Sequence, residues 1–334
     1  MNTQTEFKHK MAAHCETGTL TGLLADQGLQ LTEPMSFGIA GGIFFGYMES
    51  KNFPFPTFIV RSRPGEVREL VAKSLNIKLF KKKFKDREQG MQMLDKLIEE
   101  DRNVGVQVDF FYMEYLPEWQ RVHNNVHFIN IIGKEDSKYV ISDSYYPKIA
   151  KLDAKLLEKA RWAGGYMAPK GFIYYPIVEN TEPDLKKPIV KGIKRACRNM
   201  LKIPIPFLGI KGIYKFADKI NEWPSLTRDE EHLSHEIMKI NILLEDQGTG
   251  GAGFRYMYAT FLKQASEIMN NPTLNEMSER IMNIGDDWRQ ISYFAAKMGK
   301  NRDLGADRIR ELSEKIRKQG DAEKAFFTDL KKIY

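Results

Sequence analysis

The spacing of apolar and polar residues divides the chain into a mixed first part and a helical second part. Residues 16–28 (ETGTLTGLLADQG) show helical spacing, and Gly28 is placed to end that helix. Residues 64–75 and 86–100 also have helical patterns. Strand patterns, rich in β-branched and aromatic residues, occupy FPFPTFIV up to Val60 and residues 104–115, 127–132, 138–143 and 171–178.

From about residue 180 onward the periodicity is helical, and prolines separate the segments. We therefore predict an α+β domain over residues 1–180, built from helices and an antiparallel sheet. A mainly α-helical domain is expected over residues 181–334.

Composition and charge narrow the class of protein. The 334 residues are 42% hydrophobic and 28% charged, as in ordinary globular proteins, and no run of 18 apolar residues occurs. The start, MNTQTEFKHK, lacks the apolar core of a signal peptide, so a cytoplasmic location is expected. The net charge of +7 permits an acidic partner, but no nucleic-acid-binding signature is present.

Two cysteines, Cys15 and Cys197, are too few for a disulfide framework and should be free thiols. Cys15 stands just before the first predicted helix. The positive end of the helix dipole favours a thiolate there, and the free N–H groups can bind a developing oxyanion. A lone cysteine is more often a small buried apolar residue. Cys197 has no neighbouring base and is read as structural.

A candidate base comes from a predicted hairpin. His127 begins one strand and Asp143 ends the next, with the polar turn GKEDS between them. A turn centred on residue 135 would set His127 opposite Asp143, and the carboxylate would then orient the imidazole. Together with Cys15 they predict a Cys–His–Asp triad. A merely structural His–Asp pair is the alternative reading.

The other histidines have weaker cases. His123, four residues before His127, is the rival base but has no evident partner across the hairpin. His14, next to Cys15, would contact substrate or turn inward. His232 and His235 have a spacing compatible with a metal, although their acidic neighbours indicate a solvated helix face.

The segments HCETGTLTGLL, SFGIAGGIFFGYM and NNVHFINIIGKEDSKYVISDSYY resemble the N-terminal domain of the butirosin biosynthesis protein H family. QGTGGAGFRYMYATFLKQASEIM resembles the helical domain that follows it. The resemblance implies a papain-like cysteine peptidase fold and acyl transfer from a carrier-protein thioester to an amine. It implies Cys15 as nucleophile, His127 as base and Asp143 as its orienter, with no metal or redox cofactor.

The sequence departs from the papain-like pattern at one position. Such enzymes often place a glutamine six residues before the cysteine as an oxyanion donor, and His9 stands there. His9 would have to donate through its ring N–H, or the Cys15 N–H would do more of the stabilisation.

Two glycine-rich segments lack the sequence context of a cofactor-binding motif. GIAGGIFFG (38–46) indicates close packing through small residues, or the lining of an acyl channel beside Cys15. GTGGAG (248–253) follows a helix rather than a strand, which argues against a dinucleotide site. It is expected to be a loop between helices, with Arg255 as a candidate ligand for a substrate carboxylate or phosphate.

Residues 181–220 contain ten Lys or Arg against three acids, interleaved with apolar residues. Besides an ordinary solvated face, this pattern indicates docking of an acidic acyl carrier protein, or peripheral contact with an anionic membrane.

The sequence thus predicts a cysteine acyltransferase that takes an acyl group from a carrier-protein or coenzyme A thioester to an amine or hydroxyl of a small molecule. The alternatives are hydrolysis by the same triad and an inactive binding scaffold.

Overall fold

The computed structural model describes residues 7–50 and 53–334, so the first six residues of the segment read for a signal peptide lie outside it. The chain forms two compact units. Unit 1 runs up to Ser36 and resumes over Pro64–Pro183, and unit 2 comprises Phe37–Arg63 and Asp184–Tyr334. The continuous division at residue 180 therefore needs a correction, because residues 37–63 belong to the helical unit. Apolar periodicity shows that a strand is buried but not which core it joins.

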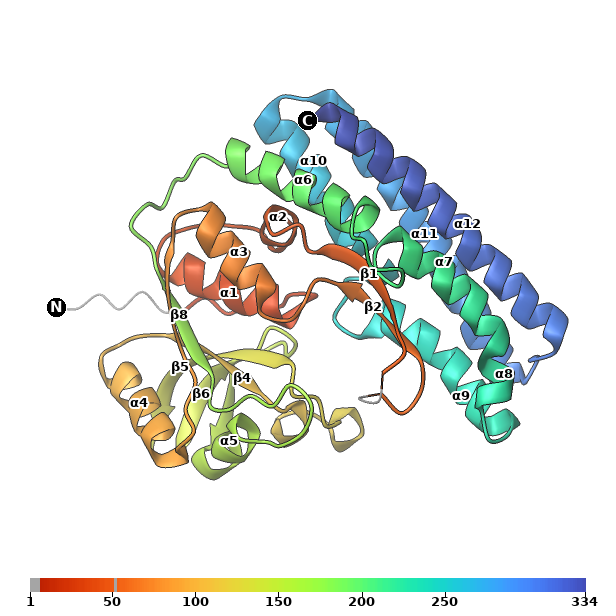
Figure 1. The fold of residues 1–334 in the computed structure, drawn as a ribbon. Helices are drawn as coiled ribbons and strands as arrows, with labels where there is room; N and C mark the ends of the chain where they lie inside the picture. Colours follow the sequence, from red (N-terminus) through yellow and green to blue (C-terminus); the bar gives the residue numbers. More distant parts are fainter. Residues whose placement is uncertain (1–6, 51–52) are drawn as a thin grey trace. The chain divides into compact units, whose positions relative to one another are not determined.

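Unit 1 contains a six-stranded sheet in which every neighbouring pair is antiparallel. The strand order is β3-β8-β4-β5-β6-β7. Figure 1 labels β4, β5, β6 and β8 of this sheet. The strands are β3 (Lys78–Lys82), β4 (Val104–Val108), β5 (His127–Glu135), β6 (Lys138–Ser142), β7 (Ala150–Asp153) and β8 (Ile173–Ile177). The expected strand over 104–115 ends early, since a 3₁₀ turn, η1 (Phe110–Tyr112), follows β4.

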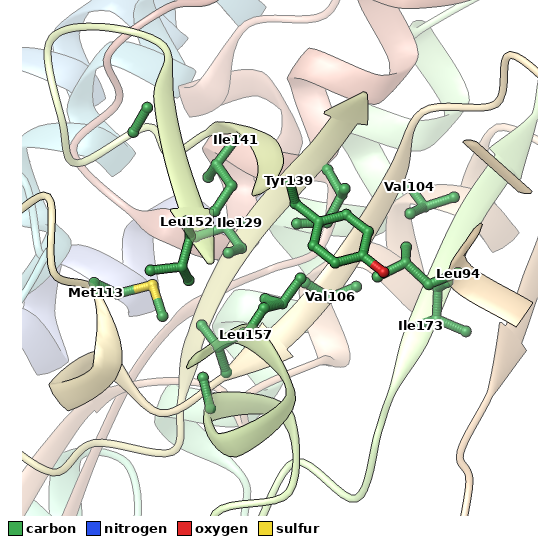
Figure 2. Close-up of a cluster of buried hydrophobic side chains, with 14 of the residues drawn as sticks. Leu94, Val104, Val106, Met113, Ile129, Tyr139, Ile141, Leu152, Leu157 and Ile173 are labelled. Atoms are coloured by element: carbon green, nitrogen blue, oxygen red, sulfur yellow. The ribbon is translucent and has the colours of Figure 1, made fainter. Parts of the chain in front are cut away.

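Helices cover the two faces of this sheet. α4 (Arg87–Glu99) and α5 (Ala154–Arg161) bury Leu94 and Leu157 against strand residues such as Val106 and Ile129. Figure 2 shows this cluster, with Tyr139 among the apolar side chains. On the other face α1 (Cys15–Asp26) packs on β4, β5 and β8, with α3 (Glu66–Ser74) beside it. The sheet is therefore buried on both faces, which explains why β5 begins with five buried residues.

Local sequence explains how α1 ends and where its side chains go. Gly28 adopts φ 88°, a left-handed conformation that glycine tolerates, and its N–H bonds the carbonyl of Ala25. Thr19 and Leu23 are buried on the sheet side of the helix. The predicted helix stop at Gly28 is thereby confirmed.

Unit 2 consists of helices and one two-stranded hairpin. The hairpin pairs β1 (Ile43–Met48) with β2 (Thr57–Arg61). Phe45 of β1 stacks on Phe216 and Trp288, two aromatic residues of the helices. The principal helices are α6 (Lys186–Leu201), α7 (Ile210–Lys219), α9 (Glu230–Asn241), α10 (Arg255–Met269), α11 (Pro272–Asn301) and α12 (Ala306–Ile333). None of the helices in residues 7–50 and 53–334 is long and apolar enough to cross a membrane.

Small residues allow close approach inside unit 2. A Cβ at Gly38 would lie 2.0 Å from the Phe261 ring, and one at Gly192 would lie 2.2 Å from the carbonyl oxygen of Gly38. The first glycines of GIAGGIFFG therefore pack against helices α6 and α10. The expected α+β class with a helical second domain is confirmed.

Candidate active site

Cys15 is the first residue of α1, and its side chain is half-buried. Its Sγ lies 3.7 Å from the carbonyl oxygen of Val126, the residue before β5. As a first-turn residue, Cys15 has an N–H that the helix itself cannot satisfy, and its thiol faces the positive end of the helix dipole. The thiol therefore stands at the N-terminus of β5, beside a ready donor for an oxyanion.

His127 and Asp143 form a buried pair. His127 Nε2 lies 2.8 Å from Asp143 Oδ2, and the side chains are 7% and 0% exposed. The Tyr115 hydroxyl donates to the same Oδ2 at 2.7 Å, and the Tyr145 N–H donates to Oδ1 at 2.9 Å. Three donors therefore hold the carboxylate in one orientation. Tyr115 was not identified from the sequence, because nothing in its neighbourhood indicates a partner 28 residues away.

The pair does not form by the expected hairpin register. Glu135 pairs with Lys138 around a turn at Asp136, whose φ is 52°, and a bulge between Ile131 and Gly133 shifts the ladder. The turn is therefore later than residue 135, and His127 and Asp143 are not directly opposed. Asp143 reaches His127 because the chain leaves the ladder after Ser142, the last residue of β6.

The environment of His127 favours the imidazolium. Burial alone would lower the pKa of His127, but the Asp143 carboxylate and a hydrogen bond with Cys15 raise it from 6.5 to about 10. Burial would raise the pKa of Asp143, but the charge of His127 and the hydrogen bonds from His127, Tyr145 and Tyr115 together lower it. Because Nε2 faces Asp143, Nδ1 is the nitrogen that can serve the Cys15 thiol. The fold thus brings Cys15, His127 and Asp143 together.

His9 has a different place from the one expected. Its Nδ1 lies 2.8 Å from Ser142 Oγ, and its Nε2 lies 3.0 Å from the carbonyl oxygen of Tyr146. Both ring nitrogens are thereby hydrogen-bonded to residues that flank Asp143 in the sequence. His9 ties down the segment that carries Asp143 and has no ring N–H left for an oxyanion, so the side-chain half of an oxyanion hole must come from elsewhere.

Glu33 holds the loop that leads into Cys15. Its carboxylate accepts the N–H groups of Ala13 at 3.0 Å and His14 at 2.7 Å, and the Thr17 hydroxyl at 2.7 Å. Burial raises the pKa of Glu33. His14 is 3% exposed, with Nδ1 bonded to Thr17 at 3.1 Å, so it turns inward rather than facing solvent. No sequence spacing relates Glu33 to Cys15, so the sequence did not reveal it.

His123 has the partner that the sequence did not show. Its Nδ1 lies 2.7 Å from Asp109 Oδ2, and the ring stacks on Phe111 with centroids 4.2 Å apart. A second His–Asp pair therefore stands on the loops that flank the first.

Arg255 and Cys197 lie in the interior of unit 2. Arg255 is 0% exposed and bonds both oxygens of Glu323, at 2.8 and 2.9 Å, while its Nη1 bonds the Gly253 carbonyl. This buried ion pair contradicts the expectation that Arg255 binds a substrate anion. Burial raises the pKa of Cys197 to about 12, which fits a structural thiol.

The loop before Arg255 is packed rather than open. Thr249 is buried and donates to the Leu244 carbonyl at 2.7 Å, and the Gly251 N–H donates to Thr249 at 3.0 Å. Glycines 248, 250, 251 and 253 all have positive φ. The glycines of GTGGAG thus serve a tight turn between helices.

A cysteine at a helix N-terminus, facing a His–Asp pair on an antiparallel sheet, defines a papain-like cysteine protein. Comparison with protein families agrees with this class. Residues 155–330 match the model described as Domain of unknown function (DUF4872), and residues 14–144 match Butirosin biosynthesis protein H, N-terminal. The chain therefore belongs to the DUF4872 family, whose model spans more than half of it, and its first part is similar to the N-terminal domain of butirosin biosynthesis protein H. The resemblance read from the sequence is confirmed.

Among solved structures, a C39-like peptidase from Bacillus anthracis matches at 16% identity with a TM-score of 0.36. The match covers 53% of this chain and 96% of that chain. A likeness of this size adds nothing to the assignment. No curated protein matches the chain.

Proposed function

We propose that the chain is a cysteine acyltransferase that acts through an acyl thioester on Cys15. The observation that supports this most directly is the pair of His127 Nε2 and Asp143 Oδ2 at 2.8 Å, which stands next in the chain to Val126, whose carbonyl oxygen lies 3.7 Å from Cys15 Sγ. An imidazole in this place takes the thiol proton as sulfur attacks a carbonyl, and returns a proton to the leaving group.

The reaction has two halves. Cys15 Sγ attacks the donor thioester, and the donor thiol leaves with a proton from His127. An amine or hydroxyl of a small-molecule acceptor then attacks the acyl carbonyl, and the C–S bond to Cys15 breaks. The Cys15 N–H at the start of α1 is the oxyanion donor that the fold supports. No step requires a metal or redox group.

We propose that the donor is an acyl carrier protein or coenzyme A thioester, as the resemblance to the butirosin biosynthesis protein H family implies. Helix α6 supports an acidic partner. Its exposed residues Lys187, Lys191, Lys194 and Arg198 are spaced by four, three and four positions, which places them in one stripe. Ile189, Ile193 and Cys197 are buried on the opposite side of the same helix.

The first experiment is the mass of the intact protein after mixing with a panel of acyl thioesters, on coenzyme A and on carrier protein. Wild type should gain one acyl group, and Cys15→Ala should gain none. Cys197→Ala is the matched control and should acylate like wild type, because Cys197 is 2% exposed and buried in α6.

The outcomes separate the candidate functions. Transfer of the acyl group to an added amine supports the transferase, whereas release of free acid at the same rate without amine indicates a hydrolase. No adduct on any thioester, with equal alkylation of both cysteines, would leave a binding scaffold as the better reading. Retained carrier-protein reactivity in the Lys191→Glu, Lys194→Glu double variant at low salt would remove α6 as the docking surface.

A further inference from the structure

If Cys15 carries an acyl group as proposed above, His123 gains a role in its transfer. The chemistry of the second half-reaction poses a proton problem. An alkylamine acceptor is an ammonium ion at neutral pH, with three N–H bonds, and the amide product keeps one. Two protons must therefore leave the nitrogen. One of them ends on the Cys15–His127 pair when the C–S bond breaks and the thiol is regenerated. The other must leave before attack, because an ammonium ion has no lone pair.

The second His–Asp pair lies on the two segments that adjoin the start of the catalytic strand. Val108, the last residue of β4, pairs with His127, so the following residue, Asp109, lies next to the start of β5. The Phe110 ring meets the His127 ring edge-on with centroids 4.8 Å apart. His123 lies three residues before Val126, whose carbonyl contacts Cys15 Sγ at 3.7 Å. The loop that carries His123 thus leads directly into the catalytic strand.

The two pairs differ in burial. The His127 side chain is 7% exposed, whereas the His123 side chain is 66% exposed, with Asp109 only 4% exposed behind it. Since Asp109 binds Nδ1, the nitrogen of His123 that remains for a substrate is Nε2. Stacking on Phe111 fixes the plane of the ring. An exposed imidazole with one oriented nitrogen can pass a proton to water, which the buried His127 cannot do.

Asp109 also has a structural task. Its Oδ1 accepts the N–H groups of Phe111 at 3.1 Å and Asn124 at 2.9 Å, which holds the loop in place. A purely structural reading would make His123 one more donor to this buried carboxylate. The two readings differ in what the removal of the imidazole changes.

We propose that His123, oriented by Asp109, is a second catalytic base that takes the first proton from an ammonium acceptor. The Nε2 lone pair forms the new N–H bond, and the acceptor nitrogen regains its lone pair. That nitrogen then forms the C–N bond as the C–S bond to Cys15 breaks. His127 takes the second proton and returns it to the Cys15 sulfur. His123 releases its proton to water, so no co-reactant is needed.

The test is a chase of isolated acyl-Cys15 enzyme with two acceptors, followed by intact mass. One acceptor is a primary alkylamine, charged at pH 7.5, and the other is hydroxylamine, mostly uncharged at that pH. His123→Gln keeps a donor for Asp109 but has no base. His235→Gln, at an exposed position of α9, is the matched control.

His123→Gln should slow transfer to the alkylamine about tenfold or more, within the range expected for general base catalysis. Transfer to hydroxylamine should stay within about twofold of wild type, since this acceptor has its lone pair already. An equal loss with both acceptors would show a structural role and overturn the proposal, as would no loss with either. Failure of wild type to form acyl-Cys15 at all would instead overturn the proposed function, and this inference with it.

Discussion

Asp143→Asn tests the electrostatic core of the site. In wild type both carboxylate oxygens accept: Oδ2 binds His127 and the Tyr115 hydroxyl, and Oδ1 binds the Tyr145 N–H. An asparagine has one acceptor oxygen and an NH₂ group. If its oxygen faces His127 and Tyr115, the NH₂ meets the Tyr145 N–H. If it is flipped, the NH₂ can bond His127 Nε2 only when the imidazole is neutral and carries its hydrogen on Nδ1. That tautomer cannot take the thiol proton through Nδ1, so neither rotamer reproduces the wild-type arrangement.

The size of the effect follows from these contacts. Asp143 contributes more than Cys15 to raising the pKa of His127, which reaches about 10 against the lowering effect of burial. Without it, the buried imidazole holds a proton less well, and it takes the thiol proton less readily. A hydrogen bond to a charged group contributes about 1.5–3 kcal/mol, which corresponds to about a 10- to 150-fold slower acylation of Cys15.

The assay is the rate of single-turnover acylation by a reactive thioester at pH 7, with urea unfolding to check the fold. Tyr115→Phe is the matched control, because it removes one donor and leaves the charge; its acylation should fall less than that of Asp143→Asn. If folded Asp143→Asn acylates at the wild-type rate, the carboxylate charge is not required. A neutral asparagine would then be enough to orient His127.

Three further predictions concern stability. The pKa of His127 is raised from 6.5 to about 10, so its protonation stabilises the fold fully below about pH 6.5, and this contribution is lost as the pH rises through 10. Urea unfolding of wild type should therefore show a free energy of unfolding that falls from pH 7 to 10. An equally steep fall in Asp143→Asn would contradict the assignment of this effect to the His127–Asp143 pair. Glu33→Gln should lower the free energy of unfolding by about 1–3 kcal/mol and slow the acylation of Cys15, because the glutamine NH₂ would meet a backbone N–H of the loop before Cys15. An unchanged free energy of unfolding together with an unchanged acylation rate would exclude Glu33 as the support of that loop. Arg255→Met should lower the free energy of unfolding by about 3–5 kcal/mol, because it leaves the Glu323 carboxylate buried and unpaired. The double variant Arg255→Met, Glu323→Leu should recover most of this loss. A stable Arg255→Met variant with impaired acyl transfer would instead support substrate binding by Arg255.

Local sequence determined the features that depend on near neighbours along the chain. The cysteine at a helix N-terminus, the stop at Gly28 and the strand character of residues 127–132 and 138–143 all follow from residue type and periodicity. The same patterns indicated the α+β first part and the helical second part. The His–Asp pairing of residues 127 and 143 was also foreseen, although for a hairpin register that the bulge after Ile131 changes.

Tertiary structure alone decided the partners that lie far apart in sequence. Examples are the hydrogen bonds of Tyr115 to Asp143, of the loop before Cys15 to Glu33, and of His123 to Asp109. No periodicity along the chain encodes such long-range hydrogen bonds. The burial of Arg255 against Glu323 is of the same kind, because a charged residue reads as exposed until its partner is placed. Segment 37–63 illustrates the physical reason at a larger scale: burial of apolar area is non-directional, so a sequence shows that a strand needs a core but only the folded chain shows which core it joins.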